Sequence, residues 1–333
     1  MDQSSLLIND STIKQLITME DTVEIIDNVF KDFAAGQVIN PGKVTLDMGE
    51  MGGWPFHEAF LNAMPAYLGS IKVAGQKFVG GFAGERAKAG LPFITAMIML
   101  VDARLGNFIS VLDGTRISNM RTGAQAAVAL KYMLNKPKLK IGMFGAGQQA
   151  RQVTHAISTV FEIEELRVWN IHRDSAETFK EDMQRYVQGD IIICEDGKDA
   201  CQVDAVFTLT PSKEALIKEE WIQKGTIVFP MGSYQEIENE LIHQSDAIVV
   251  DHVSQALNRG ILKPLYKSGQ ITEKDITASL ADLSKGPHEK IDPKNQRIIC
   301  IPIGIGATDV AVAHEVYQRA LAANLGTPFD FTA

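Results

Sequence analysis

The chain has 333 residues, of which 45% are apolar and 22% are charged, a composition typical of a folded protein with one large or two medium domains. Its net charge of −9 argues against nucleic acid as a partner, because a nucleic-acid-binding surface needs clustered basic side chains. Its longest mainly apolar run, residues 93–101, is well short of the roughly 18 residues of a membrane span, so we expect no membrane partner.

The first part of the chain combines one helix with several short strands. Thr18 has the character of an N-cap, and apolar residues recur at helical spacing after it until Gly36. Strand-like segments are predicted at residues 43–48, 59–67, 71–79, 94–101 and 108–112, and glycine and proline punctuate this region, among them Pro65, Gly80 and Gly81. This pattern predicts a mostly antiparallel sheet, followed by an alanine-rich helix over residues 122–134.

A glycine turn in the middle of the chain is the strongest local signal for a ligand site. The apolar strand predicted over residues 139–144 ends in Gly145-Ala146-Gly147, and a helical pattern begins at Gln148. In such a turn the first glycine allows the tight backbone and the second lets the backbone approach phosphate. The N-terminus of the helix then offers free N–H groups and a positive dipole end. The pattern predicts a dinucleotide pyrophosphate here, and the alternative is an ordinary strand–helix turn.

Strands and helices alternate after the glycine turn. Apolar strands are predicted at residues 166–169, 190–193, 205–209, 226–229 and 247–250, with a helix at 175–187 and a last helix at 309–324. Apolar strands separated by helices indicate a parallel sheet covered on both faces. We therefore predict an α/β fold with a Rossmann-type domain over residues 121–306. A second, mixed α+β domain, formed by residues 1–120 with 307–333, would hold the substrate.

The residues after the second strand of the Rossmann-type domain bear on the choice of cofactor. An Asp or Glu about twenty residues after the glycine turn would bind the ribose 2′-hydroxyl and repel a 2′-phosphate. This chain has Asn170 at that position, and His172 and Arg173 follow it closely. The pattern slightly favours NADP over NAD. The alternative is that His172 and Arg173 are solvated loop charges.

Further polar residues lie where a cofactor or substrate could bind. Thr208 and Thr210, at the end of the strand predicted over 205–209, either contact the adenosine side of a cofactor or are ordinary strand-end threonines. Lys77 interrupts an apolar strand, where desolvation would lower its pKa and suit proton transfer, although periodicity alone favours a structural or surface lysine. Arg121 is expected at a helix start, where a cation is disfavoured, so it either binds a carboxylate or is solvent-exposed.

The three cysteines do not suggest a metal site or a disulfide framework. Cys194, Cys201 and Cys300 lack the spacing of zinc ligands, and residues 1–7 do not resemble a signal peptide. These features predict a reducing, cytoplasmic location without a bound metal.

Four spaced motifs resemble those of the ornithine cyclodeaminase/mu-crystallin family. They read VAGQKFV, LDGTRISNMRTGAQAAVALKYML, IGMFGAGQQA and GIGATDVAVAHEVYQRA, and the resemblance extends from residue 18 to about residue 326. It implies an NAD(P)-binding Rossmann domain and a second domain that binds substrate and forms a homodimer. Members of this family include cyclodeaminases, alanine dehydrogenases, ketimine reductases and opine-type amino acid dehydrogenases.

The resemblance also implies roles for individual residues. Lys77 matches the active-site lysine near the substrate nitrogen or carbonyl, and Arg121 matches the arginine that binds the substrate carboxylate. Thr122 matches a contact with a cofactor phosphate, and the pyrophosphate turn matches Gly145, Gly147, Gln148 and Gln149. Asn170 takes the ribose position, and Gly306 and Asp309 belong to the segment that lines the nicotinamide.

The chain departs from the family pattern at two positions. Lys43 stands where a second carboxylate-binding arginine is expected, and lysine lacks the planar two-point grip of arginine. Tyr234 stands where cyclodeaminases carry an aspartate, and Glu236 is the nearest acidic substitute. Without that aspartate, release of ammonia from ornithine is doubtful, whereas hydride transfer to or from an imine is less affected.

The leading prediction is an NAD(P)-dependent oxidoreductase that transfers hydride at the C–N bond of a small amino or imino acid, with a keto acid as a related substrate. Arg121, helped by Lys43, would hold the carboxylate, and Lys77 would move the proton at nitrogen. Two alternatives stay open. One is an ornithine cyclodeaminase, and the other is a catalytically weak NADPH-binding protein of mu-crystallin type.

Overall fold

The computed structural model describes residues 4–49, 53–232 and 235–331. The chain forms two compact units. Unit 1 comprises Met1–Arg121 and Ile305–Ala333, and unit 2 comprises Thr122–Gly304. The chain passes from unit 1 to unit 2 inside helix α4 (Thr115–Met133) and returns between Gly304 and Ile305.

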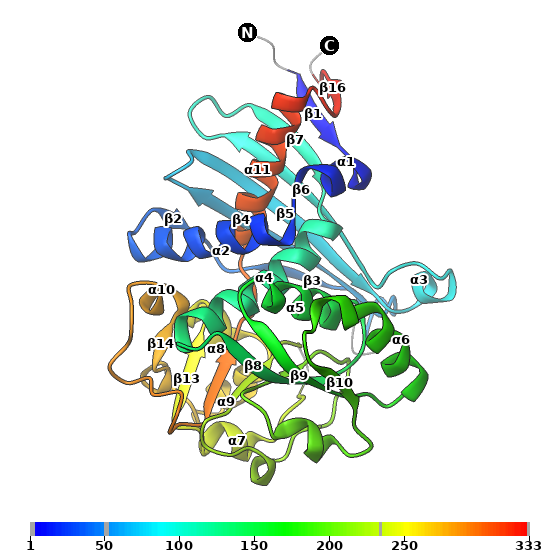
Figure 1. Ribbon diagram of the computed structural model, residues 1–333. Helices are drawn as coiled ribbons and strands as arrows, with labels where there is room; N and C mark the ends of the chain where they lie inside the picture. Colours follow the sequence, from blue (N-terminus) through cyan, green and yellow to red (C-terminus); the bar gives the residue numbers. More distant parts are fainter. Residues whose placement is uncertain (1–3, 50–52, 233–234, 332–333) are drawn as a thin grey trace. The chain divides into compact units, whose positions relative to one another are not determined.

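Unit 1 is built on an eight-stranded mixed sheet (Figure 1). Its strands are β1 (Ser5–Ile8), β2 (Val38–Ile39), β3 (Val44–Asp47), β4 (Ala59–Leu68), β5 (Val73–Phe82), β6 (Ile94–Asp102), β7 (Phe108–Asp113) and β16 (Thr327–Phe329). Its helices are α1 (Asp10–Leu16), α2 (Met19–Ala34), α3 (Glu85–Lys88), the start of α4, and α11 (Gly306–Ala323). The strand order is β16-β1-β7-β6-β5-β4-β2, with β3 also on β4, and only β1 and β7 pair in parallel. The mostly antiparallel sheet expected from the sequence is confirmed.

The two faces of this sheet differ sharply in burial. Helix α11 packs on β4, β5 and β6 and also on α2. On the covered face, Met64, Lys77, Ile98 and Leu112 pair in register across β4 to β7, and all four are buried. One residue along, Val44, Ala63, Phe78 and Met97 pair across β3 to β6 on the opposite face. There Val44, Phe78 and Met97 are 69%, 42% and 57% exposed, so this face is apolar but open.

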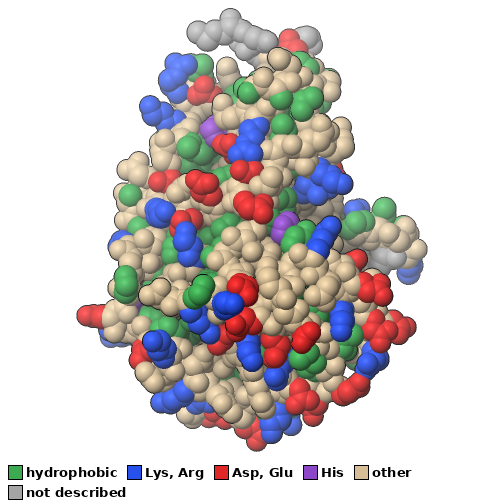
Figure 2. All heavy atoms as spheres, in the orientation of Figure 1, with side chains coloured by type: hydrophobic (Ala, Val, Ile, Leu, Met, Phe, Trp, Pro, Cys, Tyr) green, Lys and Arg blue, Asp and Glu red, His purple; other side chains and the backbone are tan. Residues whose placement is uncertain are grey.

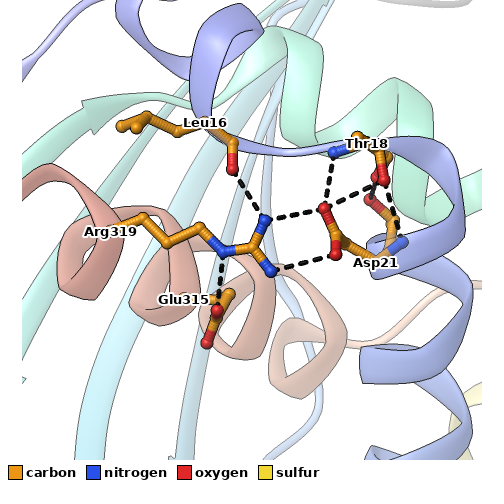
Figure 3. A network of polar contacts seen from close by, with 6 residues as sticks. Leu16, Thr18, Asp21, Glu315 and Arg319 are labelled. Carbon is orange, nitrogen blue, oxygen red and sulfur yellow. Dashed lines mark hydrogen bonds and ion pairs between the residues drawn. The ribbon is translucent and has the colours of Figure 1, made fainter. Parts of the chain in front are cut away.

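Helix α2 begins as the sequence predicts, and a polar network fixes its start. The Thr18 hydroxyl accepts a hydrogen bond from Asp21 N, and Asp21 Oδ2 accepts one from Thr18 N, which together form a capping box. Arg319 of α11 donates to both carboxylate oxygens of Asp21 at 2.7 and 2.9 Å, and to the carbonyl oxygen of Leu16 (Figure 3). The hydrogen bonds from Arg319, with those from Thr18, hold the pKa of Asp21 well below its usual value. This network ties the last helix to the first long one.

Two sequence expectations about unit 1 are wrong. Gly80 and Gly81, expected to follow the strand at residues 71–79, lie inside β5. Aromatic rings fill the space beside Gly81, because a Cβ atom there would lie 2.5 Å from the ring of Phe60 and 2.7 Å from that of Phe93. The helix expected from residue 122 starts at Thr115, after Asp113 Oδ1 accepts a hydrogen bond from Thr115 N at 3.0 Å.

Unit 2 is a parallel sheet with helices between its strands. Its strands are β8 (Lys138–Phe144), β9 (Glu162–Trp169), β10 (Asp190–Ile193), β11 (Ala205–Thr208), β12 (Ile227–Pro230), β13 (Ala247–Val250), β14 (Ala278–Ser279) and β15 (Ile298–Ile301). Its helices are the rest of α4, α5 (Gln148–Ser158), α6 (Arg173–Met183), α7 (Asn239–His243), α8 (Val253–Asn258), α9 (Leu262–Lys267) and α10 (Leu280–Leu283). Short 3-10 turns lie at Gln184–Tyr186, Gly197–Cys201, Glu219–Trp221 and Glu273–Asp275.

All neighbouring strands of unit 2 pair in parallel, in the order β10-β9-β8-β11-β12-β15-β13-β14. The first five have the order of a Rossmann fold, which confirms the predicted fold class. The order reverses between β8 and β11, and open α/β sheets bind ligands at the carboxyl ends of the strands beside such a reversal. The apolar core packs α7, α8 and α9 against β11, β12, β13 and β15.

The surface of the chain carries charges of both signs. Acidic and basic side chains are interspersed over the face that Figure 2 shows. Among the described residues, no helix is both long enough and apolar enough to cross a membrane.

Candidate functional site

A buried cluster of charged side chains lies in unit 1, on the face of the sheet that α11 covers. Lys77 Nζ lies 2.8 Å from Asp309 Oδ2, and Arg121 Nε donates to Asp309 Oδ1 at 3.1 Å. Lys77, Asp309 and Arg121 are 1%, 0% and 8% exposed. The structure therefore brings together the two predicted cations, Lys77 and Arg121, around one carboxylate. With one anion for two cations, the cluster keeps a net charge of +1, which suits an anionic ligand.

Burial is the main influence on the lysine of this cluster. It lowers the pKa of Lys77 to about 8, the charge of Arg121 acts in the same direction, and Asp309 opposes both. A lysine with such a pKa exchanges its proton near neutral pH, as a general acid or base requires. This position agrees with the sequence expectation of a lysine whose pKa falls through desolvation.

Ser118 is a member of the cluster that the sequence reasoning missed. Lys77 Nζ donates to Ser118 Oγ at 3.1 Å, and Ser118 is 6% exposed. Ser118 and Arg121 are three residues apart in α4 and so lie on one side of the helix. The three-residue spacing of Ser118 and Arg121 is visible in the sequence. It places them on one side of a helix only if that helix includes Ser118, and the helix was expected to start at residue 122.

The expectation that Arg121 lies at a helix start is wrong. Arg121 is the seventh residue of α4, beyond the first turn, so the helix dipole does not explain its position. The ion pair with Asp309 explains how the guanidinium is buried. Within the described residues, neither Nη atom of Arg121 donates a hydrogen bond, so one edge of its planar fork is available for a carboxylate.

Lys43 lies just before β3 and is half-buried. The pairing of Val44 with Ala63, and of Ala63 with Phe78, brings the start of β3 to the level of Lys77, two strands away. Strands two apart are separated by about 10 Å. Lys43 is therefore near the cluster along the sheet.

The remaining predicted residue of unit 1, Gly306, is the first residue of α11. A Cβ atom there would lie 2.5 Å from the carbonyl oxygen of Met64, so the glycine lets α11 approach β4. Gly306 and Asp309 were both expected to line a nicotinamide. In the structure the side chain of Asp309 pairs with Lys77 and Arg121, and the place of both residues beside a nicotinamide stays a prediction.

The glycine turn of unit 2 has the geometry of a phosphate cradle. Gly145 has φ +105°, and a Cβ atom on it would lie 2.9 Å from the carbonyl oxygen of Leu209, so only glycine fits. Gly147 is the N-cap of α5, and the space where its Cβ would lie is open to at least 4 Å. As a glycine, this N-cap residue has no side chain that could cap the first turn of α5, which begins with Gln148 and Gln149. Open space before uncapped N–H groups is what a pyrophosphate needs.

Neighbouring residues hold this turn in shape. Arg151 Nη1 donates to the carbonyl oxygen of Ala146 at 2.5 Å, and its Nη2 pairs with Asp182 at 2.6 Å. A Cβ atom at Gly123 would lie 2.4 Å from the carbonyl oxygen of Gln152, so α4 meets α5 at backbone distance there. This close crossing sets the half-buried Thr122, the predicted phosphate contact, beside α5.

The residues expected at the ribose follow β9. Asn170 is half-buried, and its Nδ2 donates to the carbonyl oxygen of His172 at 2.8 Å. His172 is exposed and is the N-cap of α6. Arg173 forms ion pairs with Glu177 and Glu195, so its charge is already balanced by two carboxylates. Ile171, which the sequence reasoning overlooked, is 79% exposed beside Asn170 and offers an apolar surface to a base.

Thr208 and Thr210 end β11 next to the glycine turn, but both serve a buried carboxylate. Thr208 Oγ1 and Thr210 Oγ1 donate to Glu236 at 2.9 and 2.8 Å. Thr208 is fully buried, which argues against the direct adenosine contact considered for it. Glu236, the suggested substitute for the family's aspartate, is also fully buried, and Tyr234 lies outside the described residues.

Comparison with known proteins identifies the family. The sequence matches the profile of the Ornithine cyclodeaminase/mu-crystallin family over residues 4–324, nearly its whole length. The chain belongs to this family. The resemblance predicted from its motifs is thereby confirmed.

Similar proteins act on amino or imino acids. An alanine dehydrogenase of Archaeoglobus fulgidus is 29% identical over 340 residues, with 98% of each chain covered. The solved Delta(1)-pyrroline-2-carboxylate reductase of Thermococcus litoralis, in complex with NADH and L-proline, is 29% identical, covers 97% of this chain and 99% of its own, and has a TM-score of 0.87. An archaeal alanine dehydrogenase dimer with bound NAD is 28% identical, covers 98% and 99%, and has a TM-score of 0.88.

Proposed function

We propose that this member of the ornithine cyclodeaminase/mu-crystallin family is an NAD(P)-dependent oxidoreductase that acts at the C–N bond of a small amino or imino acid. Unit 1 binds the substrate, and unit 2 binds the dinucleotide. The observation that carries the proposal is the buried Lys77–Asp309–Arg121 cluster. It combines a net positive charge with a lysine whose pKa is lowered to about 8. The names of relatives similar over nearly the full chain support the same reaction class.

In this proposal Arg121 binds the substrate carboxylate. Its Nε stays on Asp309, and its outer Nη edge receives the two carboxylate oxygens as a bidentate partner. Asp309 is a positioning residue that holds both cations in fixed orientations. Lys43 adds a further positive charge at a distance from the cluster. It attracts the anionic substrate but lacks the two-point grip of an arginine.

Lys77 handles the proton at the substrate nitrogen. In the reducing direction its ammonium protonates or hydrogen-bonds the imine, which makes the α-carbon more electrophilic. In the oxidising direction the neutral amine accepts that proton. When bound, the nicotinamide supplies or accepts the hydride at the α-carbon. The Ser118 hydroxyl, at 3.1 Å from Nζ, keeps the amine aimed in either protonation state.

The dinucleotide fits unit 2 at the glycine turn. The open space at Gly147 and the uncapped N–H groups of α5 suit the pyrophosphate, and Asn170 with Ile171 suits the adenosine end. The NADP preference suggested by the sequence is weakened, because Glu177 and Glu195 oppose a 2′-phosphate beside Arg173. We infer that the chain accepts both cofactors and uses NAD(H) at least as well as NADP(H), as the relatives with bound NAD or NADH suggest.

A substrate panel tests this function. We expect oxidation of NADH with Delta(1)-pyrroline-2-carboxylate or with pyruvate plus ammonia, and a ratio of kcat/KM for NADH over NADPH of one or more. Proline and ammonia formed from ornithine without a net change in NADH would instead support the cyclodeaminase alternative. Tight cofactor binding without turnover on any of these compounds would support the weakly catalytic, mu-crystallin-type alternative and contradict the proposal.

We also propose that the chain forms a homodimer through the open face of the unit 1 sheet. Val44, Phe78, Met97 and Phe108 lie on this face and are between 42% and 69% exposed, an apolar surface that a monomer would leave in water. A similar archaeal relative is described as a dimer. Light scattering should give about twice the chain mass of 36.5 kDa. Met97→Glu should produce monomers, and a wild-type monomer at micromolar concentration would refute the assignment.

A further inference from the structure

Glu236 is a buried carboxylate of unit 2 whose oxygens are fully occupied. It lies between β12 and α7 and is 0% exposed. Oε1 accepts hydrogen bonds from Thr210 N at 2.7 Å and from Thr210 Oγ1 at 2.8 Å. Oε2 accepts them from Thr208 Oγ1 at 2.9 Å and from Gly232 N at 3.0 Å. Four donors use the four lone-pair sites of a carboxylate.

This saturation favours the ionised carboxylate as a fixed acceptor. A protonated carboxyl would direct an O–H group at one of its four donors and lose that hydrogen bond. Burial raises the pKa of Glu236, whereas the hydrogen bonds from Thr210, Thr208 and Gly232 act in the opposite direction. Among the described residues, Glu236 forms no ion pair, so backbone and hydroxyl dipoles alone balance its charge. These contacts assign Glu236 to holding its four donors, and its suggested role in place of the cyclodeaminase aspartate stays a prediction.

The carboxylate connects two strand-end turns at the place where the strand order reverses. Thr208 and Thr210 follow β11, and Gly232 follows β12. A Cβ atom at Gly232 would lie 2.3 Å from Glu236 Oε2, so a side chain there would have to displace the carboxylate. The turn after β12 therefore packs directly against the Glu236 carboxylate.

The turn after β11 in turn packs against the glycine turn. Thr208 pairs with Phe144 across β11 and β8, and Leu209 N donates to the Phe144 carbonyl oxygen at 2.9 Å. The Cβ position of Gly145 lies 2.9 Å from the carbonyl oxygen of Leu209 and 3.1 Å from Thr210 Cγ2. A shift of the Thr208–Thr210 backbone would therefore displace Gly145, whose left-handed conformation starts the phosphate cradle.

We infer that Glu236 is a positioning residue for the dinucleotide, which fixes the glycine turn through Thr210 and Leu209. This inference rests on the proposed function, because it needs unit 2 to bind the cofactor. Glu236 touches neither the reacting atoms nor the cofactor in this scheme. Its effect falls on cofactor affinity and leaves the chemical step unchanged.

Glu236→Gln tests the inference at nearly constant volume. The amide replaces one acceptor oxygen with an NH₂ donor, which opposes Gly232 N–H or Thr210 N–H inside the core. We expect the NADH dissociation constant, measured by fluorescence, to rise about tenfold. This is the effect expected when one buried donor loses its acceptor. The kcat at saturating NADH and the KM for the imino acid should stay within about twofold of the wild type.

Glu238→Gln is the matched control. Glu238 lies two residues along the same connection, and its carboxylate accepts a hydrogen bond from Glu219 N at 2.8 Å, away from the Thr208–Thr210 turn. This variant should bind NADH as the wild type does. If Glu236→Gln fails to fold, Thr208→Val removes one donor from a fully buried hydroxyl and should weaken NADH binding in the same direction, about threefold.

The outcomes separate this inference from the proposed function. A wild-type chain that binds no NADH refutes the proposed function itself. Wild-type binding together with unchanged affinity in folded Glu236→Gln refutes only the positioning role. A large loss of kcat in Glu236→Gln with unchanged NADH affinity would also refute it, because the carboxylate would then act in the chemical step.

Discussion

Lys77→Met is expected to lower kcat for imine reduction by about 10²- to 10⁴-fold, the range that a general acid contributes. Methionine fills most of the space of the buried lysine stem, so the change removes the amine without opening a large cavity. Arg121 still pairs with Asp309, which limits the cost of leaving that carboxylate buried. Steady-state kinetics measure the loss, and NADH binding should be unchanged because the glycine turn belongs to unit 2.

The rates that depend on Lys77 should change with pH, in opposite directions for reduction and oxidation. Burial lowers the pKa of Lys77 to about 8, and reduction needs the protonated amine. The kcat/KM for reduction should therefore be level below pH 8 and fall about tenfold per pH unit above it, because kcat/KM reports the free enzyme. The kcat/KM for oxidation should rise through the same range, and Lys77→Met should flatten both limbs.

Lys72→Met is the control for this variant. Lys72 is an exposed lysine in the turn before β5, so its replacement removes the same charge from the same hairpin. It should keep wild-type rates and the wild-type pH profile. Full activity in a folded Lys77→Met protein would remove Lys77 from the mechanism.

Gly147→Trp is expected to raise the NADH dissociation constant at least about 100-fold, or roughly 2.7 kcal/mol. The backbone of Gly147 has φ −85° and ψ −167°, which any residue can adopt, and its Cβ position is open. The indole ring would thus fill the space before the first turn of α5 without disturbing the fold. Calorimetric titration with NADH measures the loss, and circular dichroism checks the fold.

A series at the same position separates steric exclusion from damage to the turn. Gly147→Ala adds only a methyl group, so its NADH affinity should lie between those of the wild type and Gly147→Trp. Gly145→Ala should instead destabilise unit 2, because a Cβ atom there meets Leu209 in a left-handed backbone. Normal NADH affinity in a folded Gly147→Trp protein would show that the pyrophosphate binds elsewhere.

The parallel sheet and the glycine turn were predictable because their signals are local. An apolar strand, two glycines and a helix occupy consecutive positions, and chain geometry then determines where the N–H groups point. The start of α2 at Thr18 was predictable for the same reason, since a capping box spans only four residues. The family resemblance extended these local signals to Lys77 and Arg121.

The charged cluster was not predictable as an arrangement, because its members are far apart in the chain. Asp309 contacts Lys77 because α11, which follows unit 2 in the sequence, packs on β5. The glycines of this sheet give a misleading sequence signal for a similar reason. Gly80 and Gly81 have the composition of a turn, but they lie inside β5, where the rings of Phe60 and Phe93 from other segments occupy the space beside Gly81.

Transfer of deuterium from NADH labelled at nicotinamide C4 tests the central claim most directly. The labelled cofactor is incubated with the chain and a small imino acid, such as Delta(1)-pyrroline-2-carboxylate, and the amino acid product is examined by NMR and mass spectrometry. The proposed mechanism predicts one deuterium at the α-carbon of the product, in proportion to the cofactor consumed. Product without deuterium, or ammonia release with the label still on the cofactor, would contradict hydride transfer at the C–N bond.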